Sequence, residues 1–448
     1  MQYLRIHIPM QLYRSIQIVL GFMLLMLTGA LLLMLPAAQT GESEIHFMDA
    51  LFTSVSAVSV TGMSMIDIQS DLSWIGQLII ICLVQTGALG IMTIAGILGI
   101  TRGRRIGLQQ RLMIQESFNM QTPSGMVALV QKIAWFTLCI EFLSGTVMAV
   151  NLYFTYGFKG IYLGYWEAVS SFCNSGFDLM GNSSSMTPFT EHPLVHASVL
   201  VTMVLGGMGF IVLDDLWKKR SWRRLTVHSK IVLTAGLFLT AAGTVLFYLL
   251  ERQNPATLGG FDIQDQWMIS FFQSVSARMA GFNMIPAEAM GKASMALNMG
   301  LMFIGAGPVS TAGGIKTTTF MILILFMWAK IRGREHIVLF HREIDDSVVL
   351  KAAFIFCFSI FLISSAFFLI LVFDTGNHTV GTVLFETISA YSTVGFTTGA
   401  VAEWNNACKV ILMMTMFIGR IGVLTLILAF AESHPSRIKF PKEKVIVG

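Results

Sequence analysis

Four glycines recur in similar surroundings along the chain, and their backbone could bind a cation. They are Gly62, Gly176, Gly281 and Gly395, and each follows a short amphipathic run and precedes Met or Phe. Rings of backbone carbonyls can replace the water shell of an ion, as they do in potassium filters. Glycine adopts the unusual dihedral angles that this needs and adds no side chain to a narrow lumen. One such glycine per repeat is what a fourfold cation pore requires.

Long apolar segments flank these glycines. The chain is 54% hydrophobic and only 12% charged, against roughly 25% charged in soluble domains, and a membrane span needs about 20 apolar residues. We expect eight spans, at 15–36, 74–101, 128–153, 194–217, 231–250, 296–328, 349–373 and 410–431. The glycine segments between paired spans are too short to cross a bilayer. They could enter it and return, because four loops around one axis would cover each other's backbone.

The sequence therefore predicts an all-α integral membrane protein with eight transmembrane helices and four re-entrant pore helices. They would form four pseudo-symmetric helix–pore-loop–helix repeats around one central pore. The third glycine loop is one residue shorter than the others. The predicted repeats are 1–111, 112–230, 231–342, and 343–448 with its C-terminal tail. The alternative, four external loops with coincidental glycines, is disfavoured by the matching flanks.

Charge patterning predicts an orientation. Basic clusters, such as those at Arg104, Lys219, Arg334 and Lys442, follow every second span. The positive-inside rule makes that side cytoplasmic and places both termini there. Acidic residues gather in the outward connections, where they could concentrate cations or be ordinary solvated loop charges.

The sixth predicted span is interrupted at 305–319. Glycines and a proline would break the helix there, while nearby hydroxyl groups could satisfy the freed backbone. The interruption is compatible with a movable obstruction beneath the glycines or with a packed structural kink. The residues expected to matter are Gly305, Gly307, Ser310, Thr311, Gly313 and Gly314.

Ionisable residues inside predicted spans are functional candidates by default. Arg420, between Gly419 and Gly422, could line the pore, set an electrostatic barrier or pair with the interruption. Lys316 could also be related to the pore, or could extend its ammonium to the cytoplasmic interface. Glu141 is at least as compatible with a hydrogen-bonded structural role, and Arg278 could brace the third loop.

These motifs together resemble the Trk/Ktr/HKT superfamily of potassium transporters. The resemblance rests on the segments SVTGM, NSGFD, AGFN and TVGFT at the four glycines, GAGPVSTAGGIKTTT at 305–319 and FIGRIGVLT at 417–425. Without the two extra N-terminal spans of Trk-type members, the chain is most similar to the Ktr-type bacterial membrane subunit. Gly62 stands where some sodium-favouring plant relatives carry Ser.

The resemblance implies potassium uptake across the plasma membrane, with sodium as a stimulating ion. It implies a homodimer docked on a cytoplasmic ring of nucleotide-binding regulatory subunits, for which the tail 433–448 is a candidate contact. It implies a gate formed by the interruption, with Lys316 and Arg420. The implied potassium ligands are Val60, Thr61, Gly62, Asn174, Ser175, Gly176, Ala280, Gly281, Val394 and Gly395.

Other classes of function fit less well. An ion-coupled carrier with alternating access could also have repeats and broken helices, but Glu141 is the one clear mid-span acid. The sequence holds no HExxH, GxSxG or Walker-type loop, so no enzyme is expected. The short basic clusters account for orientation, and we expect no nucleic-acid partner and no covalently bound cofactor.

Overall fold

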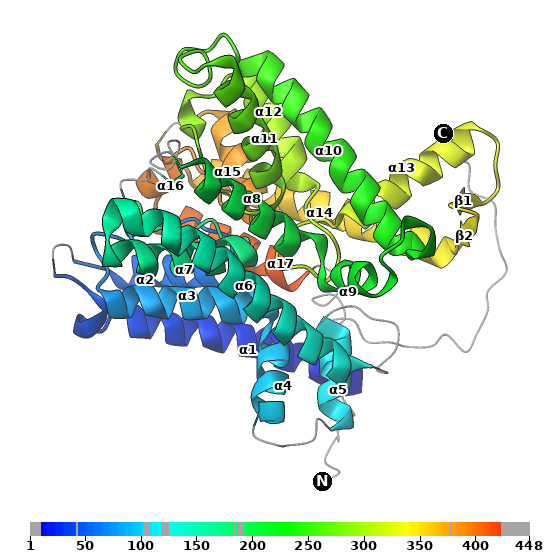
Figure 1. Ribbon diagram of the computed structural model, residues 1–448, viewed down its shortest axis with the longest axis horizontal. Helices are drawn as coiled ribbons and strands as arrows, with labels where there is room; N and C mark the ends of the chain where they lie inside the picture. The colour runs from blue at the N-terminus through cyan, green and yellow to red at the C-terminus, as the bar shows by residue number, and fades with distance from the viewer. Residues whose placement is uncertain are drawn as a thin grey trace.

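The computed structural model describes residues 10–41, 44–101, 107–117, 125–181, 185–186, 192–376 and 378–422, and almost all of its regular structure is helical (Figure 1). The helices are α1 (Met10–Leu33), α2 (Phe47–Ser59), α3 (Trp74–Leu89), α4 (Ile91–Thr101), α5 (Leu108–Ser117), α6 (Met126–Tyr156), α7 (Phe158–Cys173), α8 (Pro193–Met208), α9 (Phe210–Lys219), α10 (Val227–Glu251), α11 (Ile263–Met279), α12 (Lys292–Phe303), α13 (Thr317–Ile331), α14 (Asp346–Phe373), α15 (Val380–Ser392), α16 (Ala400–Glu403) and α17 (Asn406–Ile421). The 3₁₀ turns within the described ranges lie at Pro36–Ala38, Trp222–Arg224 and Ala287–Ala289.

A three-helix unit occurs four times. A long helix (α1, α6, α10, α14) packs on a short one (α2, α7, α11, α15), and a third helix (α3, α8, α12, α17) packs on the short helix too. Each third helix also contacts the short helix of the next unit, in the pairs α3–α7, α8–α11, α12–α15 and α17–α2. The last pair joins the fourth unit to the first, so the four units close a cycle around the short helices.

Several helices are long and apolar enough to cross a bilayer, as expected for a multi-pass membrane protein. Among the described residues they are α1 over Ser15–Leu33, α6, α10 and α14. Two predicted spans are not straight: 74–101 bends by 98° between α3 and α4, and 194–217 bends by 97° between α8 and α9. The bends fall at Gly90 and Gly209, whose φ angles of +82° and +94° end a helix. The last predicted span is described as far as Gly422, and its remainder, like the tail 433–448, lies outside the described residues.

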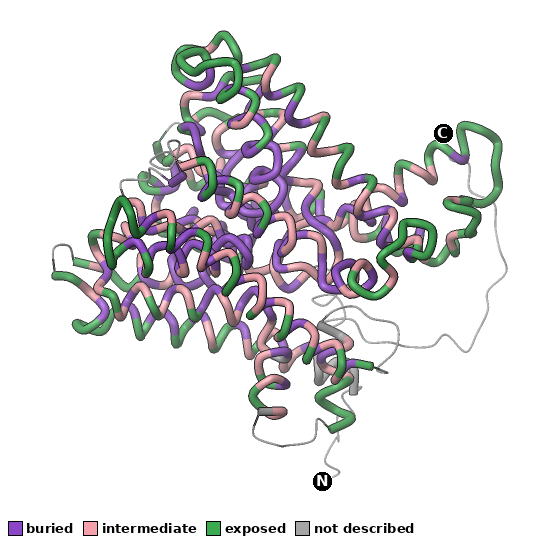
Figure 2. The backbone as a smooth tube through the Cα atoms, in the orientation of Figure 1, coloured by how far each residue is buried: buried purple, intermediate pink, exposed green. Residues whose placement is uncertain are grey.

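The outer faces of the long helices carry exposed apolar side chains. Leu24 of α1, Phe142 of α6, Phe238 of α10 and Phe368 of α14 are each more than 60% exposed. Such surfaces suit lipid rather than water. Figure 2 shows the buried residues gathered in the middle of the molecule, around the short helices, with exposed residues along the outer helices.

One short antiparallel hairpin departs from the all-α expectation. It joins β1 (Ile337–Leu339) to β2 (Arg342–Ile344). Its two turn residues, Phe340 and His341, both have positive φ angles, as the tight hairpin turn of this type requires. The predicted repeat borders after residues 111, 230 and 342 fall inside α5, α10 and β2.

Candidate functional site

The four glycines lie next to one another in a closed ring. A side-chain carbon on Gly62 would collide with the carbonyl oxygen of Ser175, and one on Gly176 with that of Ala280. One on Gly281 would meet the carbonyl of Val394, and one on Gly395 that of Thr61. Each glycine thus faces the carbonyl of the residue before the next glycine, and the fourth returns to the first. We call Gly62, Gly176, Gly281 and Gly395 the glycine ring.

The ring requires glycine for two reasons. The φ angles of its members lie between +72° and +95°, a region that residues with a side chain rarely adopt. The neighbouring carbonyls also leave no room for a Cβ. Both conditions follow from bringing four backbone segments close enough for their carbonyl groups to share one space.

Each short helix ends beside the ring. In three units the residue after the helix, or C-cap, turns the chain in left-handed conformation: Val60, Asn174 and Thr393 have φ angles of +59°, +58° and +49°. In the third unit Ala280 has a φ angle of −130°, so that turn is absent. This is how the structure accommodates the loop that is one residue shorter. The helix C-termini carry partial negative charge, which favours a cation in the ring.

A serine in the last turns of each short helix braces the ring, and it was not among the residues expected from the sequence. Gly62 donates its N–H to Ser56 Oγ at 3.0 Å, and Gly395 donates to Ser389 Oγ at 3.2 Å. Ser276 Oγ donates to the carbonyl of Phe282 at 2.7 Å, and Ser170 Oγ donates to that of Phe177. The signal was present, because these serines stand five or six residues before each glycine.

A second repeated glycine, in the third helix of three units, allows that helix to pack closely on the end of the short helix. A Cβ on Gly87, Gly206 or Gly419 would collide with the carbonyl oxygen of Val58, Phe172 or Tyr391, respectively. Three residues later, Gly90, Gly209 and Gly422 end the third helices with φ angles from +82° to +94°. The glycines that flank Arg420, Gly419 and Gly422, therefore belong to a Gly-x-x-Gly spacing that recurs in the first and second units.

The interruption between α12 and α13, residues 305–316, lies against two opposite units. At one end Gly307 donates to the carbonyl of Gly207 at 2.9 Å. At the other end Gly313 and Gly314 pack against Thr393 and Ser392 at the end of α15. The loop therefore crosses from the second unit to the fourth beside the ends of the short helices.

Thr311 ties the middle of this loop to the second unit. Its Oγ1 donates to the carbonyl of Phe172 at 3.0 Å and is hydrogen-bonded to the side-chain amide of Asn174 at 2.7 Å. Asn174 is the C-cap of α7, two residues before Gly176. A displacement of the loop would consequently disturb the chain that leads into the ring.

Arg420, in the fourth unit, connects the loop to the first unit. Its guanidinium donates to the carbonyl of Thr311, to that of Gly87 at 2.7 Å, and to that of Ala88 at 2.7 Å. The planar group, with donors fixed in a fork, can hold several carbonyls at once. Contact with the loop is thus seen in the structure, and Arg420 also lines the cavity described next.

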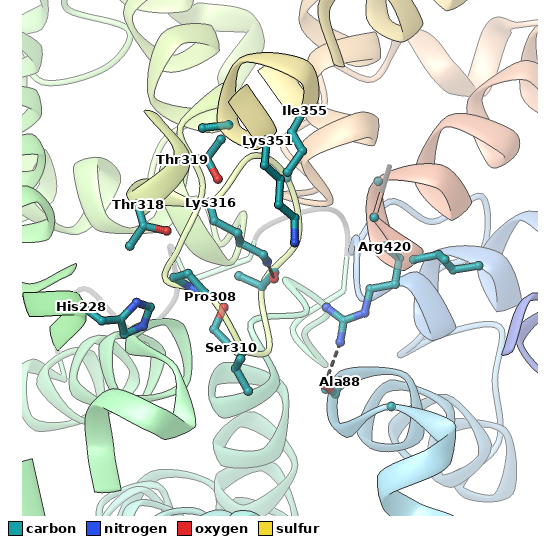
Figure 3. Close-up of a pocket in the computed structure, with 18 of the residues that line it drawn as sticks. Ala88, His228, Pro308, Ser310, Lys316, Thr318, Thr319, Lys351, Ile355 and Arg420 are labelled. Atoms are coloured by element: carbon teal, nitrogen blue, oxygen red, sulfur yellow. Dashed lines mark hydrogen bonds between the residues drawn. The ribbon is translucent and has the colours of Figure 1, made fainter. Parts of the chain in front are cut away.

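A cavity of about 520 Å³ lies beside the loop. Pro308, Ser310 and Lys316 line it, whereas no member of the glycine ring does. Figure 3 shows Lys316, Lys351 and Arg420 reaching toward a common space, with His228 on its other side. The described lining residues include no acid, so the cavity repels cations unless these bases are screened. Lys316 is held by the carbonyl of Ala312, at 2.7 Å from its Nζ.

The two remaining candidates, Glu141 and Arg278, are buried between helices. Glu141 accepts from Gln85 Nε2 at 2.9 Å and is buried, in agreement with a structural role. Arg278 is also buried, and its Nη1 donates to the carbonyl of Gly236 at 3.0 Å. The same Nη1 donates to Thr240 Oγ1 at 3.0 Å, so Arg278 ties α11, the short helix before the third glycine, to α10.

Comparisons with known proteins agree with this arrangement. The family model described as TrkH, cation transport protein, matches residues 14–441. The Ktr system potassium uptake protein B of Bacillus subtilis is 36% identical over 430 residues, covering 96% of this chain and 95% of that protein. Its namesake from Vibrio alginolyticus is 37% identical over 436 residues, covering 96% and 94%.

One further relative and one solved structure also match this chain. The potassium/sodium uptake protein NtpJ of Enterococcus hirae is 34% identical over 434 residues, covering 96% of both chains. The crystal structure of the potassium transporter TrkH from Vibrio parahaemolyticus superposes with a TM-score of 0.75 at 15% identity, covering 96% of this chain and 87% of that one. These findings confirm the resemblance seen in the motifs. The chain belongs to the TrkH family of cation transport proteins.

Proposed function

We propose that this protein takes up potassium across the plasma membrane through the glycine ring. The observation that carries the proposal is the cyclic order of the ring, in which each glycine faces the carbonyl before the next one. Carbonyls of Thr61, Ser175, Ala280 and Val394 would replace the water shell of a potassium ion. The full-length relatives that are named potassium uptake proteins support the choice of ion.

The proposed membrane arrangement is that of eight transmembrane helices and four re-entrant helices, with both termini cytoplasmic. The four short helices α2, α7, α11 and α15 would enter from outside and point their C-terminal ends at the ion. The cavity with Lys316 and Arg420 would then face the cytoplasm. The cyclic packing of four units supports this arrangement.

The loop 305–316 is proposed to be the gate. It crosses between opposite units beside the ring, and Arg420 attaches it to the first unit. An ion leaving the ring would meet this loop and the bases of the cavity. Release of the loop would remove the first obstacle and would carry Lys316 away with it, so gating would require a change in the Arg420 and Thr311 contacts.

Stimulation by sodium, homodimer formation and control by a ring of nucleotide-binding subunits complete the proposal. They follow from the resemblance to Ktr-type subunits, and the relative named a potassium/sodium uptake protein is in keeping with the first.

The proposal is tested by ion flux through the purified protein in liposomes under potassium, rubidium and sodium gradients. We expect potassium and rubidium to enter faster than sodium, and protein-free liposomes give the background. Equal entry of all three ions would refute the selective ring. If selective flux stayed absent with a regulatory ring added, an alternating-access carrier would replace the pore.

A further inference from the structure

One buried polar position recurs in the four short helices. Its occupants are Thr53, Glu167, Gln273 and Glu386, each directly after a Phe or Trp, and each is 0% exposed. Buried polar groups are almost always hydrogen-bonded in folded proteins. The partner of each side chain therefore indicates what this position does.

In the fourth unit the position fastens the chain that leaves the glycine ring. Glu386 Oε1 accepts from the backbone N–H of Thr398 at 2.6 Å, from Thr398 Oγ1 at 2.8 Å and from Thr397 Oγ1 at 2.9 Å. Thr397 and Thr398 are the second and third residues after Gly395. Three donors thus converge on a single oxygen of Glu386, and several hydrogen bonds at once hold this segment to α15.

The same helix also holds the ring glycine itself. Gly395 donates to Ser389 Oγ at 3.2 Å, and Ser389 lies one turn beyond Glu386 on α15. Gly395 is consequently fixed at its own nitrogen by Ser389 and just after it by Glu386. The two contacts together set the direction of the backbone through the ring.

The other units repeat this contact with decreasing strength. Glu167 Oε1 accepts from the N–H of Leu179 at 3.1 Å, and Thr53 Oγ1 lies 3.3 Å from Ser64 Oγ. In the third unit, neither side-chain atom of Gln273 has a hydrogen-bond partner among the described residues. The chain thus supplies a position equivalent to Glu386 that lacks the contact.

We propose that Glu386 is a positioning residue for ion selectivity, holding Thr397–Thr398 so that the ring keeps the size that potassium needs. The inference rests on the proposed potassium uptake. Selection between potassium and sodium depends on how the carbonyl cage holds its geometry. A segment released from α15 would let the Gly395 backbone relax toward the smaller ion. Glu386 would act on the ion through the backbone and never touch it.

The test compares three variants for the ratio of potassium to sodium uptake. Glu386→Leu removes the acceptor, and we expect about a tenfold lower ratio, as for the net loss of one hydrogen bond. Glu386→Gln keeps an oxygen acceptor at the same place and should stay near the native ratio. Gln273→Leu is the matched control and should leave the ratio unchanged. A native ratio in Glu386→Leu, or an equal loss in Gln273→Leu, would overturn the proposal.

A second readout keeps the proposal testable if Glu386→Leu folds poorly or if native uptake is not selective. The double variant Thr397→Val with Thr398→Val removes two hydroxyl donors and leaves Glu386 in place, so it should lower the ratio less than Glu386→Leu. Hydrogen exchange of residues 393–400 reports the contact without any transport. We expect faster exchange in Glu386→Leu than in native protein or Glu386→Gln. Unselective native uptake would refute the proposed function, whereas unchanged exchange would refute the role of Glu386.

Discussion

Arg420 in α17 donates from Nη2 to the carbonyl oxygen of Gly87 in α3 at 2.7 Å, joining the fourth unit to the first. The same guanidinium holds the carbonyl of Thr311 in the loop 305–316. A single side chain thereby links a proposed gate to the end of a helix in a different unit. Its five donors and fixed charge suit this role better than a lysine ammonium would.

Arg420→Ala should raise potassium flux, because the loop loses its attachment to α3 and the cavity loses a positive charge. Arg420→Lys should show a smaller rise, since an ammonium keeps the charge but cannot reach three carbonyls in a fork. Flux into liposomes at equal folded amounts is the measurement, with the exposed Arg332→Ala as control. Unchanged or lower flux in Arg420→Ala would assign the residue a purely structural role.

Gly62→Ser should lower the preference for potassium over sodium. A side chain at a φ angle of +94° costs about 1–2 kcal/mol, and its Cβ would push on the Ser175 carbonyl. Gly41→Ser is the matched control, because Gly41 has a φ angle of +85° but nothing near its Cβ position. Uptake ratios in liposomes decide the matter: equal ratios in both variants would mean that Gly62 is not part of the selective ring.

Features of this site that depend on the backbone preference of a single residue could be predicted from the sequence. The ring glycines and the interruption stand out in the sequence because glycine and proline break helices wherever they occur. The bends at Gly90 and Gly209 were not predicted because the apolar composition continues across both positions. Hydropathy carries no information about backbone φ angles.

Contacts between distant segments could not be read from the sequence at all. Gly62 faces Ser175 because the third helix of the first unit packs on the short helix of the second. Arg420 binds Gly87 because the third helix of the last unit packs on the short helix of the first. Ser56 and Glu386 are different: both occupy repeated positions, so a closer alignment of the four units would have singled them out. Their partners would still have been unknown, because those lie beyond a turn whose geometry depends on the packed ring.

Gly419→Ala should destabilise the protein. A Cβ at this position would collide with the carbonyl of Tyr391 near the end of α15, and overpacking of this kind costs about 1–3 kcal/mol. Gly300→Ala is the control: it is helical with open space at its Cβ position, and it should stabilise by roughly 0.5–1 kcal/mol. Thermal unfolding in detergent measures both, and a Tm for Gly419→Ala at or above the native value would contradict the close contact.

His378 should make stability depend on pH at the side of the protein where α15 begins. Its Nδ1 lies 3.0 Å from Asp374 Oδ1 and its Nε2 lies 3.2 Å from Glu403 Oε2. Burial lowers the pKa of His378, but the hydrogen bonds and charges of Asp374 and Glu403 outweigh burial and raise it above its ordinary value. The charged form is thus favoured in the folded protein.

Because the folded pKa is the higher one, the stabilisation is fully present below the unfolded pKa of about 6.5 and is lost as pH rises through the folded value. Tm should fall from about pH 6 to about pH 8 by more in native protein than in His378→Gln. The exposed His46→Gln serves as control and should keep the native slope. Parallel Tm profiles for native protein and His378→Gln would show that the bridge from Asp374 to Glu403 contributes nothing to stability. The start of α15 would then be held by Thr379, whose Oγ1 caps the helix by accepting from the N–H of Thr382 at 3.2 Å.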